Sequence, residues 1–153
     1  MKVKNRKGKF LLAPDSPGRY RRVYIDVFSI AASLSSPEEL FRGLAESGLD
    51  AILVIDAWHE GHLPLARRYV ELAERYGLPY RLSEHKPAEI YAAELCEAEC
   101  EAGAGAEGGR EGEGGKSCDC AVATRDYDAV KAAERCAVLI FRQGMFYRAE
   151  RAE

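Results

Sequence analysis

Four carboxylates in this chain stand where strands are expected to end or helices to begin. Asp26 ends the apolar run 23–26, Glu89 lies in the first turn of an expected helix, and Asp126 and Asp128 follow a later apolar run. Carboxylates gathered in one place repel one another and raise each other's pKa, so such a cluster is stable when a cation neutralises it. Oxygen ligands select Mg²⁺ or Mn²⁺ over Zn²⁺, so the expected cofactor is Mg or Mn.

A divalent ion held in this way acts on phosphate esters, because it stabilises charge on the phosphoryl oxygens and generates hydroxide. The chemistry indicated is therefore metal-assisted phosphodiester hydrolysis. Asp56 also ends an apolar run, over 51–56, and is a supporting candidate. Each acid taken alone could instead begin or cap a helix, which stabilises a fold by about 0.5–2 kcal/mol. That simpler role suits Asp26 least, because apolar residues flank it on both sides.

Strand-like and helix-like segments alternate along the chain and must position these acids. Strands are expected over 22–28, 51–56, 78–82, 120–124 and 137–141, and helices over about 35–47, 62–76, 87–101 and 126–135. The alternation predicts an α/β fold, a three-layer sandwich with a central parallel sheet of about five strands. Ligands of such sheets lie outside the carboxyl ends of the strands, where the acids stand.

A length of 153 residues favours one domain. We expect a basic arm over 1–19, the domain over 20–142 and a charged tail over 143–153. Residues 103–116 hold seven of the 14 glycines and predict a flexible insertion. No apolar run is long enough to span a bilayer, and the basic start lacks the apolar segment of a secretory signal. A cytoplasmic protein without a membrane partner is expected.

Positive charge is concentrated at the start of the chain. The first 22 residues carry eight lysines and arginines against one aspartate, whereas the whole chain has a net charge of -3. A basic arm on an acidic body suggests a polyanionic partner, although a solvated tail would show the same pattern. The candidate RNA-binding residues are Lys4, Lys7, Lys9, Arg19, Arg21 and Arg22.

Three segments resemble motifs of the PIN and NYN-type nuclease superfamily, within about residues 20–141. Val23–Asp26 is similar to the family's first strand, Pro87–Glu94 resembles its helix that opens with an acid, and Ala121–Asp128 resembles its late strand ending in Thr-x-Asp-x-Asp. The resemblance implies a PIN-like fold and cleavage of RNA with one or two divalent ions. It also implies metal-binding and catalytic roles for Asp26, Glu89, Asp126 and Asp128, with Thr124 positioning a ligand or water.

Three hypotheses for the function follow. The first is a divalent-metal-dependent ribonuclease of PIN-like type. The alternative is a catalytically inactive PIN-like module for RNA binding or assembly, since the acid that the family carries in the helix after the first strand has no firm counterpart and the candidate site contains no asparagine. A receiver-like domain with Asp56 as phosphoacceptor is weaker, because Val27 and Arg142 occupy the places of its second acid and its lysine. RNA is the expected partner, and the sequence leaves a homodimer or a protein partner open.

Four cysteines bracket the glycine-rich insertion, namely Cys96, Cys100, Cys118 and Cys120. They could bind zinc, form a disulfide such as Cys100–Cys118, or remain buried free thiols. Cys136 is expected to pack in the core.

His59 and His62 follow Asp56 closely and could form a small metal or phosphate site with it, although an exposed loop is the simpler interpretation. Motifs of serine hydrolases, HExxH metalloproteases, P-loops and dinucleotide-binding folds are absent.

Overall fold

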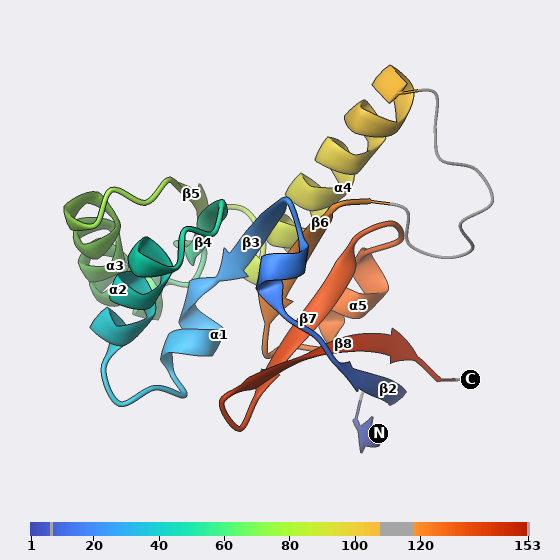
Figure 1. Ribbon diagram of the computed structural model, residues 1–153. Helices are drawn as coiled ribbons and strands as arrows, with labels where there is room; N and C mark the ends of the chain where they lie inside the picture. The colour runs from blue at the N-terminus through green and yellow to red at the C-terminus, as the bar shows by residue number, and fades with distance from the viewer. Residues whose placement is uncertain (7, 108–117, 153) are drawn as a thin grey trace.

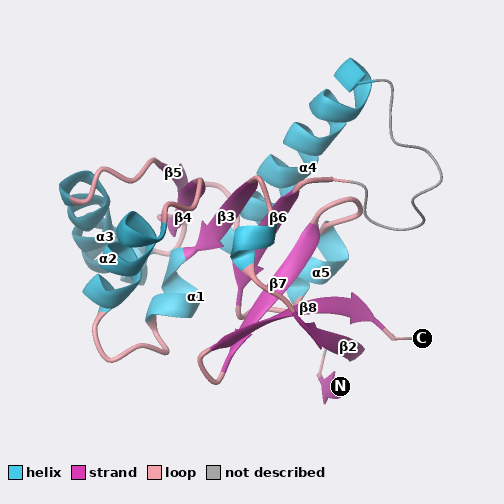
Figure 2. Ribbon diagram, in the orientation of Figure 1, coloured by secondary structure: helices cyan, strands magenta, loops and turns pink. Residues whose placement is uncertain are grey.

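The computed structural model describes residues 1–6, 8–107 and 118–152. Within these ranges the chain forms one eight-stranded sheet of order β1-β2-β8-β7-β6-β3-β4-β5, flanked by helices (Figure 1, Figure 2). The predicted α/β architecture with a parallel central sheet is confirmed. The parallel strands are β3 (Arg22–Asp26), β4 (Ala51–Asp56), β5 (Tyr80–Ser83), β6 (Cys120–Thr124) and β7 (Ala137–Arg142).

Helices cover both faces of this sheet. On one face lie α1 (Val27–Ala31), α2 (Pro37–Ser47) and α3 (Leu63–Arg75), and on the other lie α4 (Ala88–Glu107) and α5 (Asp128–Ala132). Short 3-10 turns occupy Pro17–Arg19 and Glu60–His62. None of the described helices is both long and apolar enough to cross a membrane.

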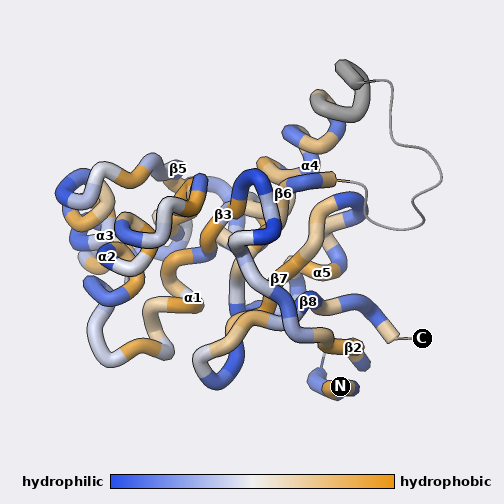
Figure 3. The backbone as a smooth tube through the Cα atoms, in the orientation of Figure 1, coloured by the Kyte–Doolittle hydropathy of each residue, from blue (hydrophilic) through white to orange (hydrophobic). Residues whose placement is uncertain are grey.

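Alternation along each central strand divides the core between the two faces. Ile25 of β3 and Leu53 of β4 pack with Phe41 on the α2 and α3 side. Tyr24 and Val54, the residues next to them in sequence, pack on the α4 side instead. Both sets are buried, so the strands read as continuous apolar runs, and Figure 3 shows β3 and β7 as largely hydrophobic. The central strands β3 and β4 therefore lie in a buried middle layer, and their carboxyl ends are where a ligand can approach.

The helix α2 illustrates how local sequence sets an element's ends. Ser36 and Glu39 form a capping box, in which each side chain accepts a hydrogen bond from the other's backbone N–H, and Pro37 occupies the first helical position. Gly48 ends the helix with a left-handed backbone of φ 77°. The predicted helix is confirmed, and it begins at Pro37, two residues after the expected start.

The first strand is shorter than predicted. It was expected over 22–28, but β3 ends at Asp26 and Val27 begins the short helix α1. Val27 and Ile30 are buried against the sheet, so tertiary packing overrides the weak helix propensity of these β-branched residues. The change of direction leaves the side chain of Asp26 at the sheet edge.

The chain ends are part of the sheet, which corrects the predicted arm over 1–19 and tail over 143–153. The strands β1 (Lys2–Asn5), β2 (Gly8–Pro14) and β8 (Met145–Arg151) extend it in antiparallel fashion. Phe10 and Leu12 are buried while Leu11 between them is exposed, the alternation of a strand with one covered face. Gln143 and Gly144 have φ values of 50° and 79°, which fit the tight turn between β7 and β8.

The predicted flexible insertion over 103–116 begins instead as helix. The helix α4 continues to Glu107, beyond the expected end near residue 101. Residues 108–116 lie outside the described part of the chain.

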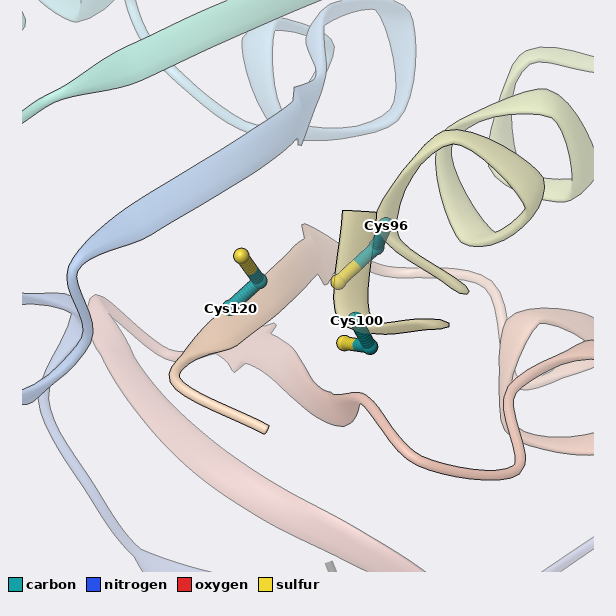
Figure 4. Close-up of side chains that lie close together, drawn as sticks. All are labelled: Cys96, Cys100 and Cys120. Atoms are coloured by element: carbon teal, nitrogen blue, oxygen red, sulfur yellow. The ribbon is translucent and has the colours of Figure 1, made fainter. Parts of the chain in front are cut away.

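Two disulfides tie α4 to the sheet. Cys96 bonds to Cys136 just before β7. Cys100 bonds to Cys118 just before β6, which was one of the alternatives that the sequence left open. Cys136 packs in the core as predicted, and its sulfur forms the bridge to Cys96. Cys120 is free and buried, and Figure 4 shows Cys96 and Cys100 on α4 beside it. Burial, together with a hydrogen bond to Glu99, raises the pKa of the Cys120 thiol to about 12.

Replacing Cys96 and Cys136 together by alanine is expected to lower the free energy of unfolding by about 2–4 kcal/mol, because the bridge spans 40 residues and restricts the unfolded chain. Chemical denaturation under non-reducing conditions measures the change. The control Cys120→Ala, which opens no bridge, should cost only about 1 kcal/mol. Equal stability of the bridge variant and the parent would contradict the assignment.

Candidate functional site

The strand β3 lies where the order of the sheet reverses. It pairs with β4 on one side and with β6 on the other. The chain therefore adds β4 and β5 on one side of β3 and then crosses over to add β6 and β7 on the other side. Such a switch point opens a crevice at the carboxyl ends of the strands. Ile25 pairs with Ala123, so the next residues of the two strands, Asp26 and Thr124, lie side by side at that end.

Hydrogen bonds through Thr124 join Asp26 to the loop after β6. The Thr124 hydroxyl donates to Asp26 Oδ2 at 2.7 Å, and the backbone N–H of Asp126 donates to Thr124 Oγ1 at 3.0 Å. Asp126 Oδ1 in turn accepts from the backbone N–H of Asp128 at 2.9 Å. Ser29 Oγ accepts from the backbone N–H of Arg125 at 3.0 Å. These bonds fix the loop 124–128 against the end of β3 and the start of α1.

Three of the predicted acids converge directly. Glu89 in the first turn of α4 and the two aspartates Asp126 and Asp128 offer carboxylate oxygens that all lie within 4.8 Å of one another. We call these three residues the acidic cluster. Asp26, of which 3% is exposed, is close enough for its charge to act on Glu89 and for Asp126 to act on it. The fold therefore places all four acids at one edge of the sheet.

The electrostatics of the site favour either a proton on one of the carboxylates or a cation bound among them. Burial raises the pKa of Glu89 to about 7, and the charges of Asp126 and Asp26 contribute to the rise. Burial also raises the pKa of Asp26, more than the hydrogen bonds from Thr124 and Ser29 lower it. Carboxylates alone make up the donor set, and hard divalent ions prefer such oxygens. The residues present thus fit Mg²⁺ or Mn²⁺.

A cleft of about 460 Å³ opens beside Asp126. Arg6, between β1 and β2, and Arg125, in the loop after β6, bring two exposed guanidinium groups to its wall. Sequence reasoning did not select either residue, because only the hairpin brings Arg6 to the carboxyl end of β6. The other residues that line the cleft are Asn5, Ser29, Ala32 and Tyr127.

The basic residues predicted to bind RNA are spread over other places. Arg19 pairs with Asp15 at 3.0 Å, Arg21 pairs with Glu99, and Arg22 pairs with Asp50 at 3.2 Å and with Glu99. Arg22 begins β3, so Arg21 and Arg22 lie at the end of this strand opposite Asp26. Lys4 and Lys9 are exposed on the N-terminal hairpin, and Lys7 lies outside the described residues. A role of these residues in RNA binding stays a prediction.

Asp56 ends β4 but belongs to a different group of side chains. Its Oδ2 lies 2.8 Å from His59 Nδ1 and 3.0 Å from His62 Nδ1, and its Oδ1 accepts from the backbone N–H of Trp58 at 2.8 Å. Burial raises the pKa of Asp56, but the hydrogen bonds from His59, Trp58 and His62 outweigh it and leave that pKa below its usual range. His59 and His62 lie on an exposed loop and helix start, as the simpler interpretation predicts, and their side chains also contact Asp56.

No protein-family model matches the sequence, and no curated protein matches it. Among solved structures, the catalytic core of Rad2 (complex I) is similar, with a TM-score of 0.58 and 18% sequence identity. The match covers 92% of this chain and 47% of the chain in that structure, so this chain spans about half the length of the catalytic core that it resembles. The likeness shows the fold, a mostly parallel sheet flanked by helices.

Without a divalent ion, the stability of the protein should fall as pH rises from about 4.5 to about 7. The pKa of Glu89 rises from its ordinary 4.5 to about 7 on folding, so the folded chain keeps a proton that the unfolded chain releases in this window. Glu89→Gln removes the ionisable group and with it this pH dependence. In EDTA at about pH 8 the variant should melt a few degrees above the parent, whereas at about pH 4 the two should melt at similar temperatures. Thermal melts at both values test this.

The matched control is Glu101→Gln, an exposed glutamate of the same helix, which should keep the fall in stability. A Glu89→Gln variant with the parent's full pH dependence would contradict the raised pKa.

Proposed function

We propose that this protein is a divalent-metal-dependent ribonuclease that hydrolyses RNA phosphodiester bonds. The observation that carries the proposal is the meeting of Glu89, Asp126 and Asp128 beside the buried Asp26, at the switch point of the sheet. The likeness of the fold to the catalytic core of Rad2 supports a nuclease. The choice of RNA rests on the sequence motifs that resemble PIN and NYN-type nucleases.

The acidic cluster would hold Mg²⁺ or Mn²⁺, with Asp26 as a further oxygen donor beside it. Burial contributes most to the raised pKa of Glu89, and repulsion from Asp126 and Asp26 adds to it. A divalent cation would relieve this repulsion. When bound, such an ion supplies positive charge for the phosphoryl oxygens and lowers the pKa of water.

The protein's own side chains prepare the site for a phosphodiester. Thr124 holds Asp26 with its hydroxyl and holds the Asp126 backbone with its oxygen, so one side chain sets the spacing of two acids. Arg6 and Arg125, at the cleft wall, can each donate paired N–H groups to phosphate oxygens. The cleft thus brings Asp126 of the proposed cation site together with two arginines that can bind the anionic backbone.

The proposed activity should require each of these acids, so that a single substitution is enough to lower it. With a fluorogenic RNA and Mn²⁺ or Mg²⁺, Asp26→Asn and Asp126→Asn are expected to lower turnover by about 10²-fold or more, since each removes negative charge that holds the ion. The control Asp119→Asn, an exposed aspartate before β6, should leave turnover unchanged. EDTA should abolish activity and added Mn²⁺ should restore it.

Two outcomes would count against the ribonuclease. Equal turnover by Asp26→Asn and the parent would place the activity elsewhere, and RNA binding without turnover would favour the catalytically inactive module. Faster cleavage of a DNA oligonucleotide of the same sequence would keep the nuclease and reject the RNA preference.

The cleft arginines should act on binding more than on turnover. Arg125→Ala is expected to raise KM for RNA and to reduce the slope of log affinity against log salt by about one, because one phosphate contact is lost. The matched control is Arg135→Ala, an exposed arginine after α5 whose side chain is not in the cleft. An unchanged salt slope in Arg125→Ala would remove this residue from the proposed RNA path.

A further inference from the structure

A second group of ligand-type side chains lies at the end of β4, outside the acidic cluster. Nδ1 of His59 and Nδ1 of His62 approach the same oxygen of Asp56, at 2.8 Å and 3.0 Å. The three ligand atoms all lie within 4.8 Å of one another. Two imidazole nitrogens and one carboxylate oxygen are thereby gathered within the span of a metal's coordination shell.

Surrounding contacts fix all three side chains. The Trp58 backbone N–H binds Asp56 Oδ1, which leaves Oδ2 for the imidazoles. The ring of His62 stacks on Phe28 with centroids 4.6 Å apart, and the ring of His59 meets Trp58 edge-on at the same separation. The Asp56 side chain is 7% exposed, whereas those of His59 and His62 are 50% and 41% exposed. The group is therefore anchored on its protein side and open on its solvent side.

The spacing suits a small tetrahedral ion. Around Zn²⁺, with ligands at about 2.0–2.1 Å, neighbouring ligand atoms are about 3.3 Å apart. The observed separations of 2.8 and 3.0 Å reach this value when the two exposed imidazoles move outward by a few tenths of an ångström. No lysine or arginine forms an ion pair with Asp56 in the part of the chain that the structure describes, so no fixed cation competes for its oxygen.

We propose that Asp56, His59 and His62 form a transition-metal site that binds Zn²⁺ in preference to Mg²⁺ and leaves a fourth position open to water or an anionic oxygen. Imidazole nitrogen favours zinc, whereas a purely carboxylate site favours magnesium or manganese. The site is distinct from the acidic cluster. Asp56 stands two residues, roughly 7 Å of strand, beyond Val54, which is the register partner of Asp26.

Equilibrium dialysis of the full chain against Zn²⁺, in non-reducing buffer with excess Mg²⁺, tests the proposal. The parent should bind one Zn²⁺ that Mg²⁺ does not displace. His59→Gln and His62→Gln should each weaken this binding by at least about 10-fold, since losing a ligand costs at least as much as losing a group that orients one. Both altered side chains are partly exposed, and thermal melting checks that the variants fold.

Two controls separate this site from others. His85→Gln alters an exposed histidine outside the cluster and should bind Zn²⁺ like the parent. Asp26→Asn should also bind Zn²⁺ like the parent, so the metal site stands even if the ribonuclease proposal fails. Co²⁺ in place of Zn²⁺ should give the visible absorption of nitrogen and oxygen ligands without thiolate charge transfer. Thiolate absorption, or unchanged Zn²⁺ affinity in His59→Gln and His62→Gln, would overturn the proposal.

Discussion

Placing the carboxylate of Asp26 at the buried end of the central strand is energetically costly, because a charged group loses its hydration there unless hydrogen bonds replace it. Thr124 supplies that replacement from the neighbouring strand. The same hydroxyl oxygen also receives the Asp126 backbone N–H, so compensating one buried acid positions a second. The spacing of Asp26 and Asp126 therefore depends on this contact between β3 and β6.

The two ends of the sheet have different roles. At the carboxyl ends of the strands, charged and polar side chains meet at the site, and their arrangement is strained by repulsion among like charges. Near the amino ends of β6 and β7, disulfides fasten α4 to the sheet. Glu89 is in the first turn of the same helix, so the covalent bonds restrain the element that carries one of the acids. Rigid support for a site of repelling groups is what preorganisation requires.

The N-terminal hairpin fixes the positions of the basic residues at the start of the chain. A free basic arm would hold RNA through long-range attraction alone. As strands β1 and β2, the same residues are held in the sheet, and Arg6 lies at the wall of the cleft beside Asp126. Arg21 and Arg22 are instead engaged with Glu99 at the far end of β3. Position in the fold, and not total charge, determines which basic side chains can serve the proposed function.

The sequence by itself determined the five parallel strands, the helices between them and the acids at the strand ends. Those features follow from local rules: continuous apolar runs for buried strands, capping residues for helices, and the alternation that forces parallel pairing. It did not reveal the hairpin, because the lysines obscured the alternation around Phe10, nor the pairing of Cys96 with Cys136. Only the tertiary structure decided that Asp56, which has His59 and His62 close by in sequence, is grouped apart from the acidic cluster, since crossovers and packing set the distances between residues far apart in sequence.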